Sequence, residues 1–313
     1  MRGVTLRKKT KKGLKKKTVK AVKAVKAVKA VKATRRQIGG AKIKIGTAQA
    51  DGYKTPTEDR VSTIINDNYS ILCVFDGHGG YKTSDYVSNN LAERINKRLL
   101  AAFAAPATFI ATTPDILKEE FMKMDGMISG DYNLSMQGST GTVCVVTPTH
   151  IIVANIGDSP AFVFSKAGVL LNETSDHDCD NPQETARLAT MGVSCIDNGL
   201  LKRLPTGLAV TRAFGDVIHR KDIVIGEPQT YIWKRVPDSI LCICSDSFVE
   251  GIDMSIPSIR AMYDNKHIVE ELLPFLKSSK FDLQVAADAA VKARVTNMRN
   301  NGDNTSLILA SLP

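Results

Sequence analysis

Acidic residues recur beside glycine, asparagine or serine at the borders of apolar runs in this sequence. Four of these acids, taken in chain order, are Asp76, Asp158, Asp246 and Asp303. The segment TEDR contributes two more, Glu58 and Asp59. A set of carboxylates without accompanying Cys and His ligands selects a hard cation, Mg²⁺ or Mn²⁺, over structural zinc. Two such ions about 3.5–4 Å apart can hold a bridging water, lower its pKa and promote an in-line displacement at phosphorus.

The position of these acids at strand ends bears on how they are interpreted. Any one of them alone is more simply a turn residue, because Asp-Gly and Gly-Asp pairs are common in hairpin turns. Strand ends of a packed sandwich lie at its rim, however, where residues distant in sequence can converge, and converging carboxylates repel one another unless cations neutralise them. Gly77 follows Asp76, and a residue without a Cβ lets its carbonyl or the waters of a metal approach closely. The set as a whole therefore favours a divalent metal site.

Short apolar runs bounded by Gly, Asn, Asp and Pro indicate the strands that would carry these acids. We predict strands at residues 71–75, 142–147, 151–156, 161–165, 223–228, 239–245 and 306–310. Longer segments predict helices at residues 83–104, 114–128, 182–191, 267–278 and 282–299. The strands come in clusters and do not alternate regularly with helices, which favours the α+β class. The expected architecture is a central β-sandwich of two mainly antiparallel sheets flanked by α-helices.

The charge of the chain divides into two parts. Residues 1–36 hold 16 of the 42 Lys and Arg residues and none of the 32 Asp and Glu residues, so the remainder carries a net charge of −6. Lys-Ala-Val repeats from Lys20 to Ala33 would turn the lysines around a helix and leave no continuous apolar stripe. We therefore predict a disordered basic tail at residues 1–37 and one domain at residues 38–313. The tail would bind nucleic acid or nuclear import factors, or it would only solubilise the chain.

The cysteines and the apolar runs bear on localisation. Six cysteines show no CxxC spacing, and four of them lie inside apolar runs, so the set is predicted to be reduced. No apolar run approaches the ~18–20 residues that span a bilayer, and the N-terminus lacks the apolar core of a secretory signal. We expect an intracellular monomer without a membrane span, in the cytoplasm or the nucleus.

Eight motifs occur in a fixed order along the body of the chain. They are TEDR, VFDGHGG, GSTG, ANIGDS, DH at 176–177, TRAFGD at 211–216, CSDS and GDN at 302–304. In this order they resemble the motifs of the metal-dependent type 2C serine/threonine protein phosphatases, over about residues 45–310. The resemblance implies a β-sandwich flanked by helices and a centre of two Mg²⁺ or Mn²⁺ ions, with a weaker third ion as an option. It also implies hydrolysis of phosphoserine and phosphothreonine in protein substrates without a phosphoenzyme.

The resemblance assigns the metal ligands position by position. The ion pair would be held by the carboxylates of Asp59, Asp76, Asp246 and Asp303 together with the carbonyl of Gly77. A weaker third ion would be bound by Asp158, and Glu250 stands where the family has a further acid.

Three more residues would act around these ions. Glu58 resembles the acid that orders metal-bound water, and Asn304 would orient the adjacent Asp303. His78 lies where the family has its general acid for the leaving alkoxide, a role that suits a pKa near neutrality. The simpler alternative for His78 is a turn histidine that hydrogen-bonds to backbone.

Several positions depart from the family pattern. Lys54 stands where the family has an Arg that grips phosphate, and an ammonium keeps the charge without the two-pronged fork, so substrate binding should weaken. Ser247 replaces a Gly and Glu250 replaces an Asp, which alters the geometry of a third ion. The leading hypothesis is a metal-dependent protein phosphatase. The alternatives are a pseudophosphatase that binds phosphoproteins and a nucleic-acid-binding protein that works through its basic tail.

Overall fold

The computed structural model describes residues 43–52, 54–197, 202–219, 223–250, 264–297 and 303–313. The tail predicted at residues 1–37 lies outside these ranges, so the boundary between tail and domain stays a prediction. No helix in the described ranges has the length and apolar character needed to cross a membrane.

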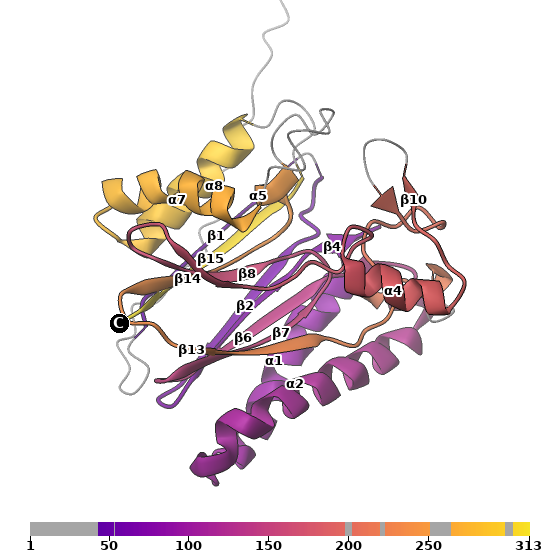
Figure 1. Ribbon diagram of the computed structural model, residues 1–313, viewed down its shortest axis with the longest axis horizontal. Coiled ribbons are helices and arrows are strands. Elements are labelled where there is room, and N and C mark those ends of the chain that lie inside the picture. Colours follow the sequence, from indigo (N-terminus) through magenta and orange to yellow (C-terminus); the bar gives the residue numbers. More distant parts are fainter. Residues whose placement is uncertain (1–42, 53, 198–201, 220–222, 251–263, 298–302) are drawn as a thin grey trace, which may run out of the picture.

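Two five-stranded antiparallel sheets lie face to face at the centre of the fold (Figure 1). The first, called here the β14 sheet, has the order β1 (Ile45–Ala50), β15 (Thr305–Leu312), β14 (Ser239–Cys244), β8 (Ala161–Ser165) and β9 (Leu170–Glu173). The second, the β3 sheet, has the order β13 (Gln229–Lys234), β7 (His150–Ile156), β6 (Gly141–Val146), β3 (Ser70–Phe75) and β2 (Arg60–Ile65). The predicted sandwich of mainly antiparallel sheets is confirmed.

Strand β3 shows how the sandwich forms its cores. All six of its residues are buried, and successive side chains point to opposite faces of a sheet. Ile71, Cys73 and Phe75 belong to the core beneath the helices, whereas Leu72 and Val74 belong to the core between the two sheets. A strand buried on both faces reads as a continuous apolar run, which is the signal that located it in the sequence.

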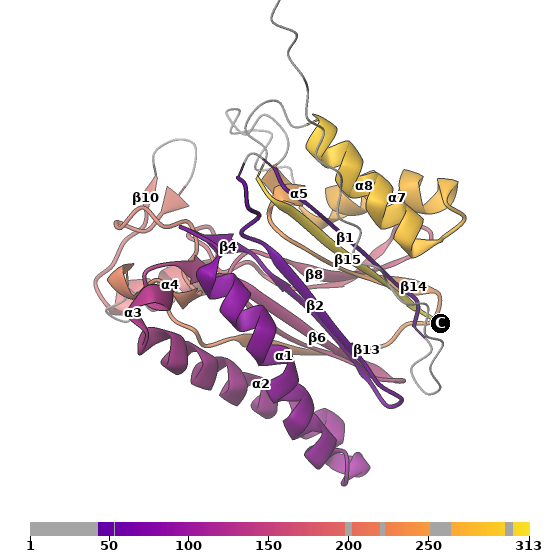
Figure 2. The same cartoon turned by 180° about the vertical axis from the view of Figure 1, so that it is seen from behind.

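Helix pairs cover the two outer faces of the sandwich (Figures 1 and 2). Helices α1 (Lys82–Ala102) and α2 (Pro106–Ser129) cover the β3 sheet, and α7 (Asn265–Ser278) and α8 (Leu283–Asn297) cover the β14 sheet. Strand β1 approaches α8 so closely that a Cβ on Gly46 would collide with the backbone of Leu283. Glycine is therefore required there to seat the helix on the edge of the sheet.

The remaining elements lie at one end of the sandwich. Helix α4 (Pro182–Thr190) and the hairpin of β10 (Ile196–Asp197) and β11 (Lys202–Arg203) form a side lobe with a small core of its own. Strands β12 (Phe214–Gly215), β5 (Gly138–Ser139) and β4 (Gly77–His78) pair in that order as a small third sheet. The short helices are α3 (Tyr132–Ser135), the 3₁₀ turn η1 (Val217–His219) and α5 (Ser247–Glu250).

Two secondary-structure predictions were wrong. Residues 223–228 do not form a strand: Ile225 makes only an isolated bridge to Arg212, and Val224 packs in the core of the side lobe. Helix α2 begins at Pro106 and not near Pro114, which lies inside the helix. Proline is favoured at the first position of a helix, and the sequence offers both Pro106 and Pro114 as such a start. The sequence pattern alone does not distinguish between them.

The prediction that all cysteines are reduced was also wrong. Cys73, Cys144, Cys242 and Cys244 are free and buried, as expected from their apolar runs. Cys179 and Cys195, which lie outside those runs, form a disulfide in the side lobe. Helix α4 lies between them in the sequence, so the pairing depends on how the lobe folds around the helix and not on CxxC spacing.

Candidate functional site

The register of the β3 sheet brings three of the predicted acids to one end. Arg60 pairs with Phe75, so Asp59 precedes β2 and Asp76 follows β3 at the same end of the sheet. Strand β6 begins and β7 ends there too, which places Asp158, just past β7, beside them. This convergence follows from antiparallel pairing, because one strand ends where its neighbour begins, at the same end of the sheet.

The β14 sheet contributes its residues at the corresponding end. Cys244 pairs with Leu307, so Asp246 follows β14 and Asp303 precedes β15 at the same end of the sheet. The turn that carries Asp158 connects β7 of one sheet directly to β8 of the other, so these two ends coincide. All five predicted aspartates therefore gather at one end of the sandwich.

Two buried or half-buried amides tie the two sheets together at this end. The Gln49 Nε2 donates to the carbonyl of Asp59 at 2.8 Å and to Ser306 Oγ at 3.1 Å. The Asn304 side chain donates from Nδ2 to the carbonyl of Lys54 at 2.9 Å and accepts from the Glu58 N–H at 2.7 Å. We expected this side chain to orient Asp303, but it holds the loop from Lys54 to Glu58, and the backbone N–H of Asn304 donates to Asp303 Oδ1 instead.

Mutual repulsion and burial perturb the clustered carboxyls. Burial raises the pKa of Asp59 to about 6, although the nearby side chains of Ser306, Asp76 and Ser245 lower it in part, and the charge of Asp303 adds to the rise. Burial, and then the charges of Asp59 and Asp246, raise the pKa of Asp76 well above its usual range. Burial and the charge of Asp158 raise the pKa of Asp246 to about 7. Each shift has the sign expected for carboxylates that lack a cation partner.

Lys54 lies against the acids of this cluster. Its Nζ is 2.9 Å from Asp303 Oδ2 and 3.3 Å from Glu58 Oε2. Partial burial lowers the pKa of Lys54, but the hydrogen bond and the charge of Asp303 outweigh it and raise the pKa above its usual value. The positive charge predicted here is thus present, and it is held by two of the predicted site residues.

Gly77 and the residues after β14 complete the predicted set. A Cβ on Gly77 would collide with the carbonyl of Glu58 and with Ser84 Oγ, so only glycine fits between them. Ser247, which replaces the family glycine, is buried and lies 3.1 Å from Ser245 through the two hydroxyl oxygens. The side chain of Glu250 lies outside the described part of the structure, and its predicted contact with a third ion stays a prediction.

His78 lies on β4 and contacts a residue that the sequence analysis did not single out. Its Nε2 is 2.6 Å from Oδ2 of Asp216, the last residue of the TRAFGD motif. Burial lowers the pKa of His78, but the hydrogen bond and charge of Asp216 outweigh it and raise the pKa. The motif was noticed in the sequence, and its contact with His78 could not be inferred without the pairing of β4, β5 and β12.

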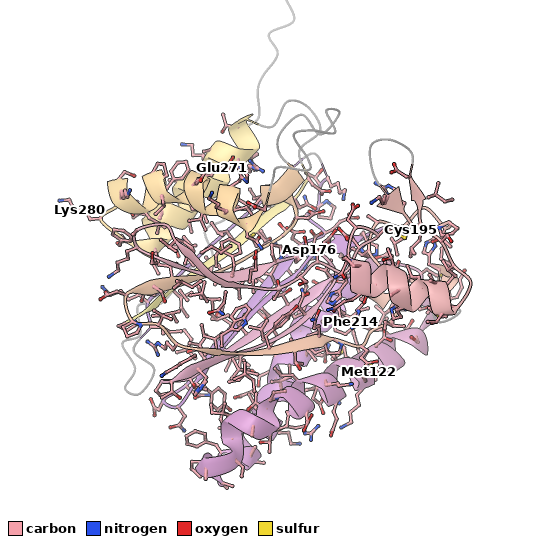
Figure 3. All side chains as sticks on the ribbon, in the orientation of Figure 1. Met122, Asp176, Cys195, Phe214, Glu271 and Lys280 are labelled. Carbon is pink, nitrogen blue, oxygen red and sulfur yellow. A yellow bond between two sulfur atoms is a disulfide. The ribbon has the colours of Figure 1, made fainter. Side chains whose placement is uncertain are left out.

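Asp176 is a second acid that the sequence analysis left without a role. Burial and the charges of Asp158 and Asp178 raise its pKa well above the usual range. Figure 3 shows Asp176 at the end of the sandwich that faces α4. It also lines an open cleft of about 390 Å³, together with Asp178, Asp180 and Asn181. The acidic surface therefore continues from the predicted site onto the side lobe.

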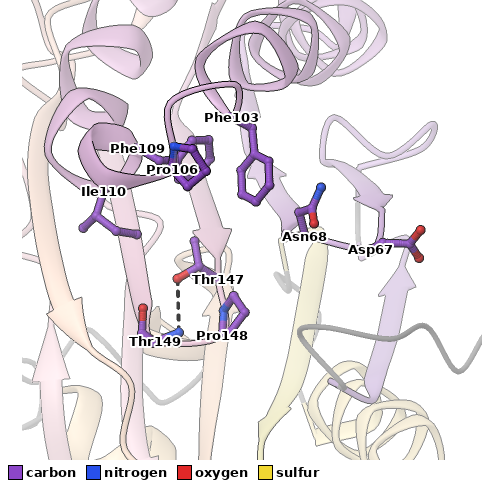
Figure 4. A pocket seen from close by; sticks show the side chains of 9 residues that line it. All are labelled: Asp67, Asn68, Phe103, Pro106, Phe109, Ile110, Thr147, Pro148 and Thr149. Carbon is purple, nitrogen blue, oxygen red and sulfur yellow. Dashed lines mark hydrogen bonds between the residues drawn. The ribbon is translucent and has the colours of Figure 1, made fainter.

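An apolar pocket lies away from this cluster. Its volume is about 230 Å³ and it is lined by residues that include Asn68, Phe103, Phe109 and Pro148 (Figure 4). Asn68 precedes β3, whereas Asp76 follows it, so the pocket is at the opposite end of that strand. It is separate from the acids and has no part in their chemistry.

One direct observation supports a divalent cation among these aspartates. The Asp59 side chain is fully buried, and neither of its carboxylate oxygens has a donor within hydrogen-bond distance among the described residues, although Ser245 and Ser306 lie near enough to lower its pKa. A buried carboxylate without a donor or a cation is strongly unfavourable. Within the described ranges, no three Asp, Glu, His or Cys side chains lie close enough together to form an ion site.

Comparison with known proteins matches the chain to one family. Its family model, protein phosphatase 2C, matches residues 43–250. Protein phosphatase 1B of Mus musculus is 28% identical over 230 residues, which is 66% of this chain and 58% of that protein. The probable protein phosphatase 2C 8 of Oryza sativa subsp. japonica is 30% identical over 261 residues, which is 77% of this chain and 62% of that protein.

Solved structures show the same fold. A phosphatase of Toxoplasma gondii superimposes with a TM-score of 0.70 at 20% identity, covering 88% of this chain and 94% of that one. A sex-determining protein of C. elegans gives a TM-score of 0.68 at 22% identity, covering 87% and 65%. The chain spans less than two thirds of the curated relatives named above, but the family match covers more than half of the chain itself. The chain therefore belongs to the protein phosphatase 2C family.

Proposed function

We propose that this protein hydrolyses phosphoserine and phosphothreonine in protein substrates at the acidic end of the sandwich. The observation that carries the proposal is the gathering there of Asp59, Asp76, Asp246 and Asp303 from both sheets, with the Asp59 oxygens buried and unpartnered. Membership of a metal-dependent phosphatase family supports it.

The four aspartates would hold two divalent ions, with the carbonyl of Gly77 as a further ligand and Asp158 and Glu250 beside a weaker third ion. Bound Mg²⁺ or Mn²⁺ would neutralise the carboxylates and activate a water for attack on phosphorus. Glu58 lies next to Asp59 and would orient that water through its carboxylate.

Two basic residues would act on the phosphate ester itself. Lys54 carries a charge that would contact the phosphate, and its position beside Asp303 keeps it at the cluster. His78 would donate a proton to the serine or threonine oxygen as the bond from phosphorus to that oxygen breaks. The products are then the free hydroxyl side chain and inorganic phosphate.

The test is hydrolysis of a phosphothreonine peptide with Mn²⁺ and with EDTA. We expect turnover that requires the metal and falls at least on the order of 100-fold in Asp59→Asn, which removes a ligand charge. Asp67→Asn is a matched control, because Asp67 is an exposed aspartate beyond the other end of β2 and should leave turnover unchanged.

Tight binding of the phosphopeptide without any metal-dependent turnover would overturn the proposal and favour a phosphoprotein-binding module. The nucleic-acid and nuclear-import roles concern the tail, which lies outside the described residues. Those roles, the monomeric state and the cytoplasmic or nuclear location stay predictions.

A further inference from the structure

We propose that Asp216 is the positioning residue of His78, holding the imidazole so that its other ring nitrogen can serve the leaving oxygen. The inference rests on the proposed function, because it gives His78 a reaction to serve. It also assigns a role to the TRAFGD motif, whose last residue is Asp216.

The small third sheet creates the contact. His78 and Gly215 both pair with Gly138, His78 from β4 and Gly215 from β12. The side chains of His78 and Asp216 therefore meet over Gly138, with Nε2 and Oδ2 2.6 Å apart. A Cβ on Gly138 would collide with both of these atoms, so the glycine of the GSTG motif leaves the space in which the pair forms.

The backbone at Asp216 is held in a conformation that residues with a Cβ rarely adopt. Its φ is +53°, in the left-handed region, and the preceding Gly215 has a φ of +76°. The N–H of Asp216 donates to the carbonyl of Gln137 at 3.1 Å, and its carbonyl accepts from the His219 N–H at 2.8 Å. These bonds fix the carboxylate where it meets His78, and backbone strain of this kind is concentrated at functional sites.

The exposure of the two side chains differs in the way a positioning pair requires. The Asp216 side chain is only 4% exposed, whereas the His78 side chain is 26% exposed. The carboxylate accepts the Nε2 proton from the buried side, which fixes the ring orientation and selects Nδ1 as the nitrogen for the opposite side. An orienting acid behind a catalytic imidazole works in the same way in other hydrolases.

The first test compares two leaving groups in Asp216→Asn. An alkoxide needs a proton as it departs, whereas p-nitrophenolate is a weak base and departs with little help. We expect kcat on a phosphothreonine peptide to fall about 10-fold to 100-fold and kcat on p-nitrophenyl phosphate to fall much less. Asparagine tolerates the left-handed backbone, so the fold should persist.

Asp238→Asn is the matched control. Asp238 is also an aspartate in the left-handed region, at a φ of +56°, but it is exposed and pairs with Lys166. Its substitution should change neither rate. Equal losses on both substrates in Asp216→Asn would overturn the proposal, because a structural defect does not depend on the leaving group.

The second test is a double-mutant cycle with His78→Gln. If Asp216 acts through His78, the double variant should be no slower on the peptide than His78→Gln alone. If the rate losses of the two single variants multiply in the double variant, the role of Asp216 is overturned, whereas the proposed phosphatase function of the native protein is not affected. If Asp216→Asn fails to fold, Gly138→Ala displaces the same contact and should give the same selective loss. A native protein without metal-dependent turnover would overturn the proposed function and this inference with it.

Discussion

Replacing Asp59 by Asn should stabilise the metal-free protein while it abolishes activity, and the gain should depend on pH. Asp59 is fully buried, and burial raises its pKa to about 6 in the folded protein, against 3.8 for an unperturbed aspartate. The folded state thus binds the proton more tightly than the unfolded state. Stability contributed by this group is fully present at low pH and is lost as pH rises from about 4 through 6.

The size of the effect follows from the two pKa values. Linkage gives a penalty of roughly 1 kcal/mol at about pH 4.5 and roughly 3 kcal/mol at about pH 7.5, where Asp59 must be charged. Asparagine is neutral at both pH values and removes the pH-dependent part. In EDTA, the free energy of unfolding of Asp59→Asn should therefore exceed that of the native protein by roughly 2 kcal/mol more at the higher pH than at the lower one.

Urea unfolding in EDTA at both pH values measures this difference. Asp67→Asn, an exposed change at the opposite end of β2, should show no comparable pH-dependent gain. Mn²⁺ should stabilise the native protein more than it stabilises the Asp59→Asn variant, because the ion supplies the counter-charge that the Asp59 carboxylate lacks. A gain that is the same at both pH values, or a variant less stable than the native protein at the higher pH, would refute the argument that Asp59 is a charge buried without a partner.

Three further outcomes are expected. Lys54→Arg should lower KM for a phosphopeptide several-fold, on the order of the effect of one added charge-assisted hydrogen bond, because a guanidinium can bind two phosphate oxygens at once. An unchanged or higher KM in steady-state kinetics would contradict this. Glu184→Gln should lower the free energy of unfolding by roughly 3 kcal/mol at neutral pH, because Glu184 is buried between Arg187 and Arg212. Burial raises the pKa of Glu184, but the bonds to Arg212 and Thr211 outweigh it and lower the pKa from 4.5 to about 2, so this stabilisation is full above about pH 4.5 and is lost as the pH falls through about 2. Thiol titration of the protein denatured without reductant should give four free thiols and, after reduction, six, and six before reduction would disprove the Cys179 to Cys195 pair.

The strands that the sequence revealed are those in the interior of the two sheets. β15, β14 and β8 of one sheet and β7, β6 and β3 of the other were all predicted, because burial on both faces makes their sequences continuously apolar. The strands of these two sheets that were missed are the four edge strands, β1, β9, β13 and β2. Their burial alternates or is incomplete, as in β2, so polar residues interrupt the apolar run and hide the strand.

The false strand at residues 223–228 has the opposite cause. Its apolar residues are needed to fill the small core of the side lobe, where Ile223 and Val224 pack against Leu188 and Leu204. Burial alone produced the apolar run, without a neighbouring strand to complete a ladder. The disulfide of the same lobe was missed for a related reason, since the approach of Cys179 and Cys195 is a property of how the lobe folds.

The predicted site residues differ from the missed ones in the kind of signal they carry. Asp76, Asp158, Asp246 and Asp303 each lie beside a predicted apolar run, which places them at the rim, and antiparallel pairing then brings these strand ends together. Asp59 precedes the missed strand β2, so it was singled out only by the TEDR motif. Asp216 has no such local signal. Its meeting with His78, 138 positions away, depends on three strands of two residues each and on a glycine that leaves room between them. Strands that short have no periodicity to detect, and so the contact that would orient the acid could be found only in the folded structure.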